Sequence, residues 1–255
     1  MYRGLYTATI GMMTQMNRMD ALTNNIANVN TTGYKKDTVA TRSFADELMS
    51  RLDDPQSAQH ANPIGALNMG VFVDDIYTDF SQGSLQQTDG KLDTALTASG
   101  FYCVNVKNPD GSTQEMYTRD GAFSLGPDGS LLTLEGNQVI GQNGPIVLPQ
   151  GDISIDESGN ISVDGQQADQ LKIVDFGNLH SLRKTGDNLY TTTSGSQQKA
   201  YTGQVEEGFL EGSNVNSVKE MVDMINISRI YEANSKMLTS QDTLLGEAVS
   251  QIASR

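Results

Sequence analysis

The C-terminal end of the chain constrains its fold more than any other part. Apolar side chains recur there at every seventh residue, and further apolar residues lie beside this stripe. From Ser217 to Ile252 there is no proline and a single glycine, so we predict one continuous helix of about 50 Å. A narrow apolar stripe cannot bury so long a helix inside a compact domain, so the helix requires a partner helix. The stripe and its neighbours are Met224, Tyr231, Leu238, Leu245 and Ile252, with Met221, Ile225 and Val249.

A second stripe with the same period lies at the N-terminus. The pattern ends at residues 28–33, where Gly33 can adopt the left-handed conformation that terminates helices. We therefore predict an N-terminal helix that pairs with the C-terminal helix in a coiled-coil-like segment. The residues of this second stripe are Leu5, Met12, Met19 and Ile26, with Leu22 in the intermediate position.

The middle of the chain has the pattern of β-structure. Residues 153–155 and 161–163 alternate apolar and polar side chains on either side of a glycine-containing turn, which indicates a hairpin. Pro127-Asp128-Gly129 has the composition of a tight turn, because proline restricts φ and glycine permits positive φ. Short apolar runs predict four more strands, at 101–106, 131–134, 146–148 and 171–176.

These patterns predict an α+β fold. Residues 71–209 are expected to form a central antiparallel β domain. Residues 1–36 and 210–255 are expected to form a discontinuous helical assembly domain. Residues 54–70 are small, polar and interrupted by proline, and we interpret residues 37–70 as a connecting segment with a possible short helix at 44–52.

The composition argues against several classes of function. The net charge is −14, whereas binding to nucleic-acid phosphates requires clusters of Lys and Arg. Cys103 is the only cysteine, so no disulfide can form within the chain. Its two histidines leave few ligands for a metal site. No catalytic or nucleotide-binding motif occurs, so we expect no enzyme activity, cofactor or small-molecule substrate. No apolar run is long enough for a transmembrane helix, and the N-terminus has no apolar signal-peptide region.

Three strings resemble segments of the flagellar rod and hook proteins. Residues 22–35, LTNNIANVNTTGYK, are similar at every position to the N-terminal signature of this family. Residues 207–215, EGFLEGSNV, followed by RIYEAN at 229–234, resemble its C-terminal motif, and YTRDGAF at 117–123 is similar to a segment of its β domain. The motif residues singled out are Asn24, Asn28, Thr31, Gly33, Tyr34, Ser213, Asn214, Val215, Arg229, Tyr231 and Glu232.

The resemblance implies a structural subunit of the flagellar basal-body rod. Such a subunit would polymerise through its terminal helices into a hollow axial tube that transmits torque from motor to hook. Its implied partners are further copies of the chain, other rod and hook proteins, and the flagellar type III export apparatus. The implied location is the basal body, where the rod crosses the periplasm and peptidoglycan, reached without a cleaved signal peptide.

The sequence also bears on the type of rod subunit. Residues 81–88, SQGSLQQT, resemble the distal rod proteins, and we favour that type over the proximal one. Residues 44–69 lack the stretch that is typical of the distal type. The alternatives are a hook or other flagellar axial subunit, and a secreted β-rich adhesin, which would not need amphipathic helices at both ends.

Overall fold

The chain folds into two compact units, each built from segments distant in the sequence. A computed structural model describes residues 2–50, 63–107, 111–193 and 195–253. The helix unit comprises residues 1–26, 37–77 and 217–255, and the β unit comprises residues 27–36 and 78–216. These bounds differ from the predicted ones in two respects. Residues 37–77 belong to the helix unit, and residues 27–36 and 210–216, which were expected in the helical domain, belong to the β unit.

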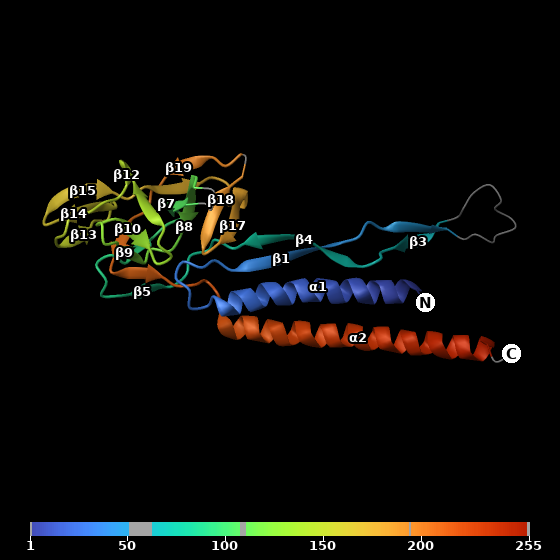
Figure 1. Ribbon diagram of the computed structural model, residues 1–255. Coiled ribbons are helices and arrows are strands. Elements are labelled where there is room, and N and C mark those ends of the chain that lie inside the picture. The colour runs from blue at the N-terminus through green and yellow to red at the C-terminus, as the bar shows by residue number, and fades with distance from the viewer. Residues whose placement is uncertain (1, 51–62, 108–110, 194, 254–255) are drawn as a thin grey trace. The chain divides into compact units, whose positions relative to one another are not determined.

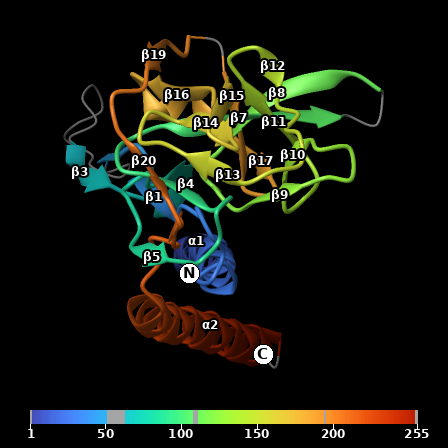
Figure 2. The same cartoon turned by 90° about the vertical axis from the view of Figure 1, so that its left-hand side faces the viewer.

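The helix unit contains two long helices, α1 (Tyr2–Ala27) and α2 (Ser217–Ala253). The predicted bounds of α2, Ser217 to Ile252, agree with this to one residue. Gly4 of α1 lies against Gln241 of α2, and Gly11 lies against Asn234. Moving seven residues forward along α1 corresponds to moving seven residues back along α2, so the pair is antiparallel (Figure 1). Figure 2 shows the two helices side by side from a second direction. A coiled-coil supertwist of this pair stays a prediction.

A β-ribbon packs beside α1 in the same unit. It consists of β1 (Asp37–Ser43) paired with β4 (Val71–Thr78), and β2 (Glu47–Ser50) paired with β3 (Pro63–Leu67). The Thr14 hydroxyl donates to the Val71 carbonyl at 2.8 Å. The Asn25 amide donates to the Asp37 carbonyl and accepts from the Asp37 N–H, both at 2.9 Å. The ribbon is therefore fastened along α1.

The ribbon corrects the expectation of a connecting segment with a short helix at 44–52. Residues 44–46 form a loop, residues 47–50 form β2, and residues 51 and 52 lie outside the described part of the chain. The Phe44 ring packs on the Phe72 ring with centroids 4.9 Å apart. This cross-strand contact favours the extended conformation, and it is invisible to local sequence patterns because it joins the two arms of the ribbon.

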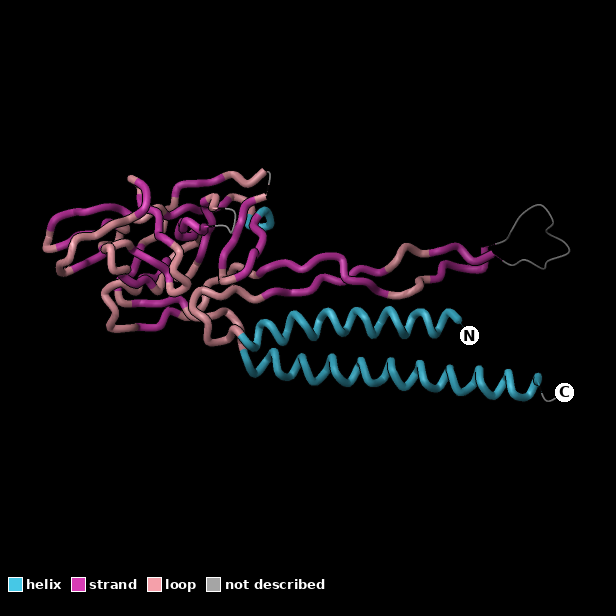
Figure 3. The backbone as a smooth tube through the Cα atoms, in the orientation of Figure 1, coloured by secondary structure: helices cyan, strands magenta, loops and turns pink. Residues whose placement is uncertain are grey.

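The β unit is built around a ten-stranded antiparallel sheet (Figure 3). Its main strand order is β17-β18-β8-β7-β11-β10-β9, β12 pairs with β11, and β16 pairs with both β7 and β19. The predicted strands at 101–106, 131–134 and 171–176 are confirmed as β7, β10 and β16. The strands are β7 (Phe101–Lys107), β8 (Thr113–Thr118), β9 (Phe123–Leu125), β10 (Leu131–Thr133), β11 (Gln138–Gly141), β12 (Gly144–Pro145), β16 (Ile173–Phe176), β17 (Leu182–Gly186), β18 (Leu189–Thr192) and β19 (Gln198–Ala200).

One predicted strand of this sheet is wrong. Residues 146–148 form no named strand, and only Val147 makes an isolated bridge, to Ser130. Ile146 and Leu148 are nonetheless buried in the core. The apolar run therefore predicted the burial of these side chains correctly. Apolar periodicity cannot show whether a neighbouring strand pairs with the segment through backbone hydrogen bonds.

A three-stranded sheet and two strand pairs complete the β unit. The predicted hairpin is confirmed by β13 (Ile153–Ile155) and β14 (Asn160–Val163), with Ser154 opposite Ser162. The third strand is β15 (Gln166–Gln170). The two pairs are β5 (Leu85–Gln87) with β21 (Phe209–Glu211), and β6 (Thr94–Leu96) with β20 (Val205–Glu207); the short helix η1 (Leu179–Ser181) precedes β17.

Apolar side chains cover both faces of the central strand β7. Tyr102 and Val104 join one core cluster, and Phe101 and Cys103 join the other. Adjacent residues of a strand point to opposite faces, which explains why β7 reads as an uninterrupted apolar run. Burying an aromatic or aliphatic side chain contributes roughly 1.5–3 kcal/mol, so this strand anchors the β unit from both sides.

Candidate functional site: the motif cluster and the assembly helices

Three segments that resemble the flagellar family meet at one buried carboxylate. Glu211 accepts from Lys35 Nζ at 2.6 Å through Oε1, and from Arg119 Nε at 2.5 Å through Oε2. Their side chains are at most 4% exposed. Together with Asn214, we call these residues the motif cluster. The N-terminal, central and C-terminal motifs thus contribute one charged side chain each.

Burial and charge act in opposition on the titration of this cluster. Burial alone would raise the pKa of Glu211, but the Arg119 and Lys35 charges outweigh it and lower the pKa below its usual value. The pKa of Lys35 is also lowered, because burial of its ammonium outweighs the attraction of Glu211. The pKa of Glu211 is therefore governed by its two cations, and the pKa of Lys35 by its burial.

The lowered pKa of Glu211 predicts a loss of stability in acid. An unfolded glutamate titrates near pH 4.3, so the contribution of Glu211 is complete above that pH and is lost as pH falls through its lower folded pKa. Glu211→Gln keeps the shape but has no charge to titrate. We expect the difference in unfolding free energy between wild type and this variant, measured in urea from pH 7 to pH 3, to shrink below about pH 4. A difference that stays constant across this range would contradict the assignment.

Asn214 holds the two terminal motifs together through its side-chain amide. It accepts from the Lys36 N–H at 2.8 Å and donates to the Asp79 carbonyl at 2.7 Å. The Gly33 N–H donates to the Glu211 carbonyl at 2.7 Å. The segments that follow α1 and precede α2 in the sequence are therefore hydrogen-bonded to each other within the β unit.

Gly33 has the left-handed conformation that was predicted, with φ +64°. The reason differs from the prediction, because α1 already ends at Ala27. A Cβ at Gly33 would lie 2.6 Å from the backbone of Arg119 and Asp120. The glycine therefore permits the close approach of the N-terminal motif to the central one, where the Thr32 hydroxyl donates to the Asp120 carboxylate at 2.7 Å. Burial raises the pKa of Asp120.

Other motif residues take local structural roles in the β unit. The Thr31 hydroxyl donates to Asn28 Oδ1 at 3.2 Å. Tyr34 is buried, and Lys184 Nζ lies 4.0 Å from the centre of its ring, a cation–π contact. Ser213 Oγ accepts from the N–H of Val215, which is buried.

The apolar stripe of α2 lies mostly on its less exposed side. Met224, Leu238 and Leu245 are half-buried, whereas Tyr231 is 36% and Ile252 is 77% exposed. Leu5, Met12, Met19, Leu22 and Ile26 of α1 are also half-buried. The flanking residues and the remaining motif residues of the helices are exposed, and their role in assembly stays a prediction: Met221, Ile225, Val249, Asn24, Arg229 and Glu232.

A further apolar stripe on α2 was missed by the sequence reasoning. Ile230, Met237 and Leu244 recur at seven residues and are 45–56% exposed. On α1, Tyr6, Met13 and Met16 are 58–62% exposed. The period of seven was visible in the sequence, but each residue of the α2 stripe directly precedes one of the predicted stripe and was hidden by it.

Lys35, Arg119 and Glu211 lay inside the recognised strings but were not singled out either. Lys35 and Glu211 are 176 positions apart, and Arg119 and Glu211 are 92 apart. A local sequence pattern cannot reveal an ion pair between residues so far apart in the sequence. The only available signal was the presence of two basic residues and one acidic residue, each in a different motif string.

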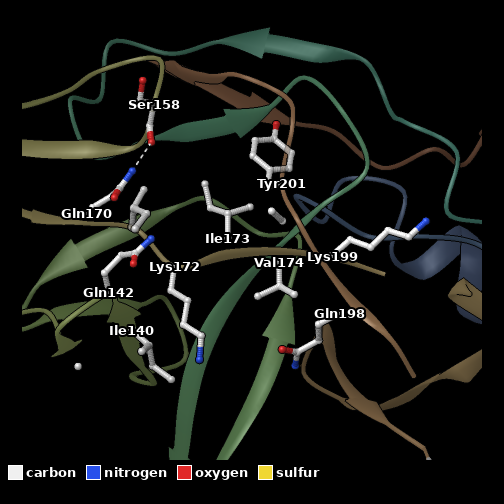
Figure 4. Close-up of a pocket in the computed structure, with 14 residues that line it drawn as sticks. Ile140, Gln142, Ser158, Gln170, Lys172, Ile173, Val174, Gln198, Lys199 and Tyr201 are labelled. Carbon is white, nitrogen blue, oxygen red and sulfur yellow. Dashed lines mark hydrogen bonds between the residues drawn. The ribbon is translucent and has the colours of Figure 1, made fainter. Parts of the chain in front are cut away.

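A cavity of about 650 Å³ in the β unit shows no converging reactive groups (Figure 4). Lys172 and Lys199 point in different directions from its lining. Lys172 Nζ contacts Glu115 at 2.9 Å, and the Gln170 amide donates to the Ser158 carbonyl at 3.0 Å. Among the described residues, His, Cys, Asp and Glu form no group of three that could hold a metal ion.

The comparisons with known proteins place the chain in the class of flagellar axial proteins. The family model described as "Flagella basal body rod protein" matches residues 5–35. The model "Flagellar hook protein FlgE/F/G D1 domain" matches residues 95–163, and "Flagellar basal body rod FlgEFG protein C-terminal" matches residues 206–252.

Curated relatives match over nearly the whole chain. The flagellar basal-body rod protein FlgG of Agrobacterium fabrum is 37% identical, covering 95% of this chain and 96% of the relative. FlgG of Borreliella burgdorferi is 34% identical (97% and 98%), and the basal-body rod protein FlgF of Caulobacter vibrioides is 32% identical (99% and 98%).

The chain therefore belongs to the FlgG/FlgF-type family of flagellar basal-body rod proteins. It is a structural protein of the flagellar basal body and not an enzyme. Within the described residues, neither helix is apolar enough over sufficient length to cross a membrane.

Proposed function

We propose that the chain is a rod subunit that polymerises through α1 and α2 into a hollow axial tube, which transmits torque from motor to hook. The observation that carries this proposal is the exposed stripe of Ile230, Met237 and Leu244. Apolar residues repeated at seven on a helix surface fit a further helix, and the stripe remains uncovered within the helix unit. A second copy of the chain is the partner that repeats with every subunit.

The motif cluster supports the mechanical part of the proposal. The chain enters α2 and leaves α1 through segments that share Glu211 and Asn214. Buried charge-assisted hydrogen bonds are shorter and stronger than neutral ones. Load applied to either helix would therefore reach the β unit through the same cross-linked segments.

The proposal extends to partners and location. Other rod and hook proteins would continue the tube at either end, and the flagellar type III export apparatus would deliver the subunit without a cleaved signal peptide. Within the basal body, the rod would cross the periplasm and peptidoglycan. The distal type is supported by residues 81–88 and by the two FlgG relatives above, at 37% and 34% identity, beside the FlgF relative at 32%.

Electron microscopy tests the polymerisation directly. Concentrated full-length protein is expected to form tubes or fibres, because only the full chain carries the exposed stripes. A version that lacks residues 1–26 and 217–255 is expected to stay dispersed. Circular dichroism of the shortened version checks that its β-structure persists. Polymers from the shortened version, or none from the full chain at any concentration, would contradict the proposal.

A further inference from the structure

The surface between α1 and α2 carries amide side chains where an apolar seam would be expected. We define the α1–α2 seam by Gly4 and Gly11 of α1 with Asn234 and Gln241 of α2. The Gln241 amide lies against Gly4, and an ideal Cβ at Gly11 would lie 3.1 Å from Asn234 Nδ2. Each amide thus occupies the space left by a glycine.

The seam is not optimised for stability. Within the seam, the Oε1 atom of Gln241 is buried and, across the described residues, has no hydrogen-bond partner. A buried polar atom without a partner destabilises a fold, whereas an apolar side chain of similar size would not. The amides therefore require an explanation other than the strength of the helix pair.

The two glycine–amide contacts are compatible with a single register. If α1 slid by seven residues in one direction, Gln241 would face Gly11, but Asn234 would face Arg18 instead of a glycine. If it slid the other way, Asn234 would face Gly4, but Gln241 would lie beyond Tyr2, where α1 begins. Only the observed alignment gives both amides a glycine.

An apolar stripe by itself cannot make this choice. Apolar residues repeated at seven are nearly equivalent after a shift of one repeat, and buried polar residues are the device that selects one register in paired helices. A slip of one repeat would move one helix along the other by about 10 Å. It would also move the exposed residues of α1 relative to those of α2.

We propose that Asn234 and Gln241, seated on Gly11 and Gly4, determine the antiparallel register of α1 on α2 and do so at a cost in stability. The inference concerns one chain and does not depend on the proposed polymerisation. Its consequence for the molecule is that the relative positions of the exposed apolar residues on the two helices are set by polar contacts.

The register can be measured with spin labels on the full-length chain in dilute solution. Thr23 and Lys236 are exposed residues of α1 and α2 that lie about 20 Å apart along the helix axes in the observed register, and both are replaced by cysteine in a Cys103→Ala background. In the otherwise wild-type chain we expect one narrow distance distribution. In the Asn234→Leu/Gln241→Leu variant we expect a second population displaced by about 10 Å, together with a higher melting temperature of the helical signal.

Ser240→Leu provides the matched control, because it adds an apolar side chain at an exposed position of α2 outside the α1–α2 seam. It should leave the single distance unchanged. If the double variant loses its helical signal, Asn234→Leu alone is measured in the same way. A broad distribution in the wild-type seam, or a single unchanged distance in the helical Leu variant, would overturn the register assignment. A lower melting temperature in the Leu variant would overturn the stated cost.

Discussion

Replacing Glu211 by alanine is expected to lower the unfolding free energy of the β unit by about 3–5 kcal/mol. The change removes the one carboxylate that Lys35 and Arg119 share, and it leaves two cations buried without their counter-charge. Urea denaturation followed by near-ultraviolet circular dichroism measures the loss. The loss should be far larger than the value of an exposed ion pair, which is about 0–1 kcal/mol.

Arg42→Ala is the control for this measurement. Arg42 pairs with Asp74 at 3.8 Å on the ribbon, and its side chain is 69% exposed. Its removal should change stability little, because solvent screens an exposed pair. Equal unfolding free energies for Glu211→Ala and Arg42→Ala would show that the motif cluster does not stabilise the contact between the three family motifs.

The second large effect is expected from charges placed on the exposed stripe of α2. The Met237→Lys/Leu244→Lys variant should raise the concentration needed for polymerisation at least a hundredfold. Each buried side chain of this type contributes roughly 1.5–3 kcal/mol, and about 1.4 kcal/mol corresponds to a factor of ten in an equilibrium constant. Sedimentation of polymer at graded protein concentrations measures the shift.

A matched variant separates the stripe from the added charge. Thr243 and Ser250 are exposed on α2 and are also seven residues apart. Thr243→Lys/Ser250→Lys adds the same charge outside the stripe and should polymerise nearly as the wild type does. Equal inhibition by both variants would show that net charge, and not the stripe, controls polymerisation.

Local sequence patterns predicted the elements in which apolar side chains recur at a regular spacing. The period of seven identified α2 to within one residue, and alternation identified the β13–β14 hairpin. The same reasoning gave the wrong structure for residues 44–50, because Phe44 and Phe72 pair across the ribbon. Their separation in sequence hides that contact from any local pattern.

The motif residues show the same division. Gly33 was recognised as a glycine that needs positive φ, but the physical cause lies 86 positions away at Arg119. The exposed stripe of α2 (Ile230, Met237 and Leu244) was missed in the sequence for a related reason. Two neighbouring stripes have the same period, and only packing against α1 distinguishes the covered stripe from the exposed one.

The sequence by itself determined the helical ends, the β-rich middle and the family, because periodicity and the terminal motifs are local properties. Only the tertiary structure decided that the three motifs share Glu211, that residues 37–50 and 63–78 form a ribbon beside α1, and which apolar residues of α2 remain exposed. These features depend on contacts between distant segments. Burial and charge pairing become defined only when folding brings such segments together.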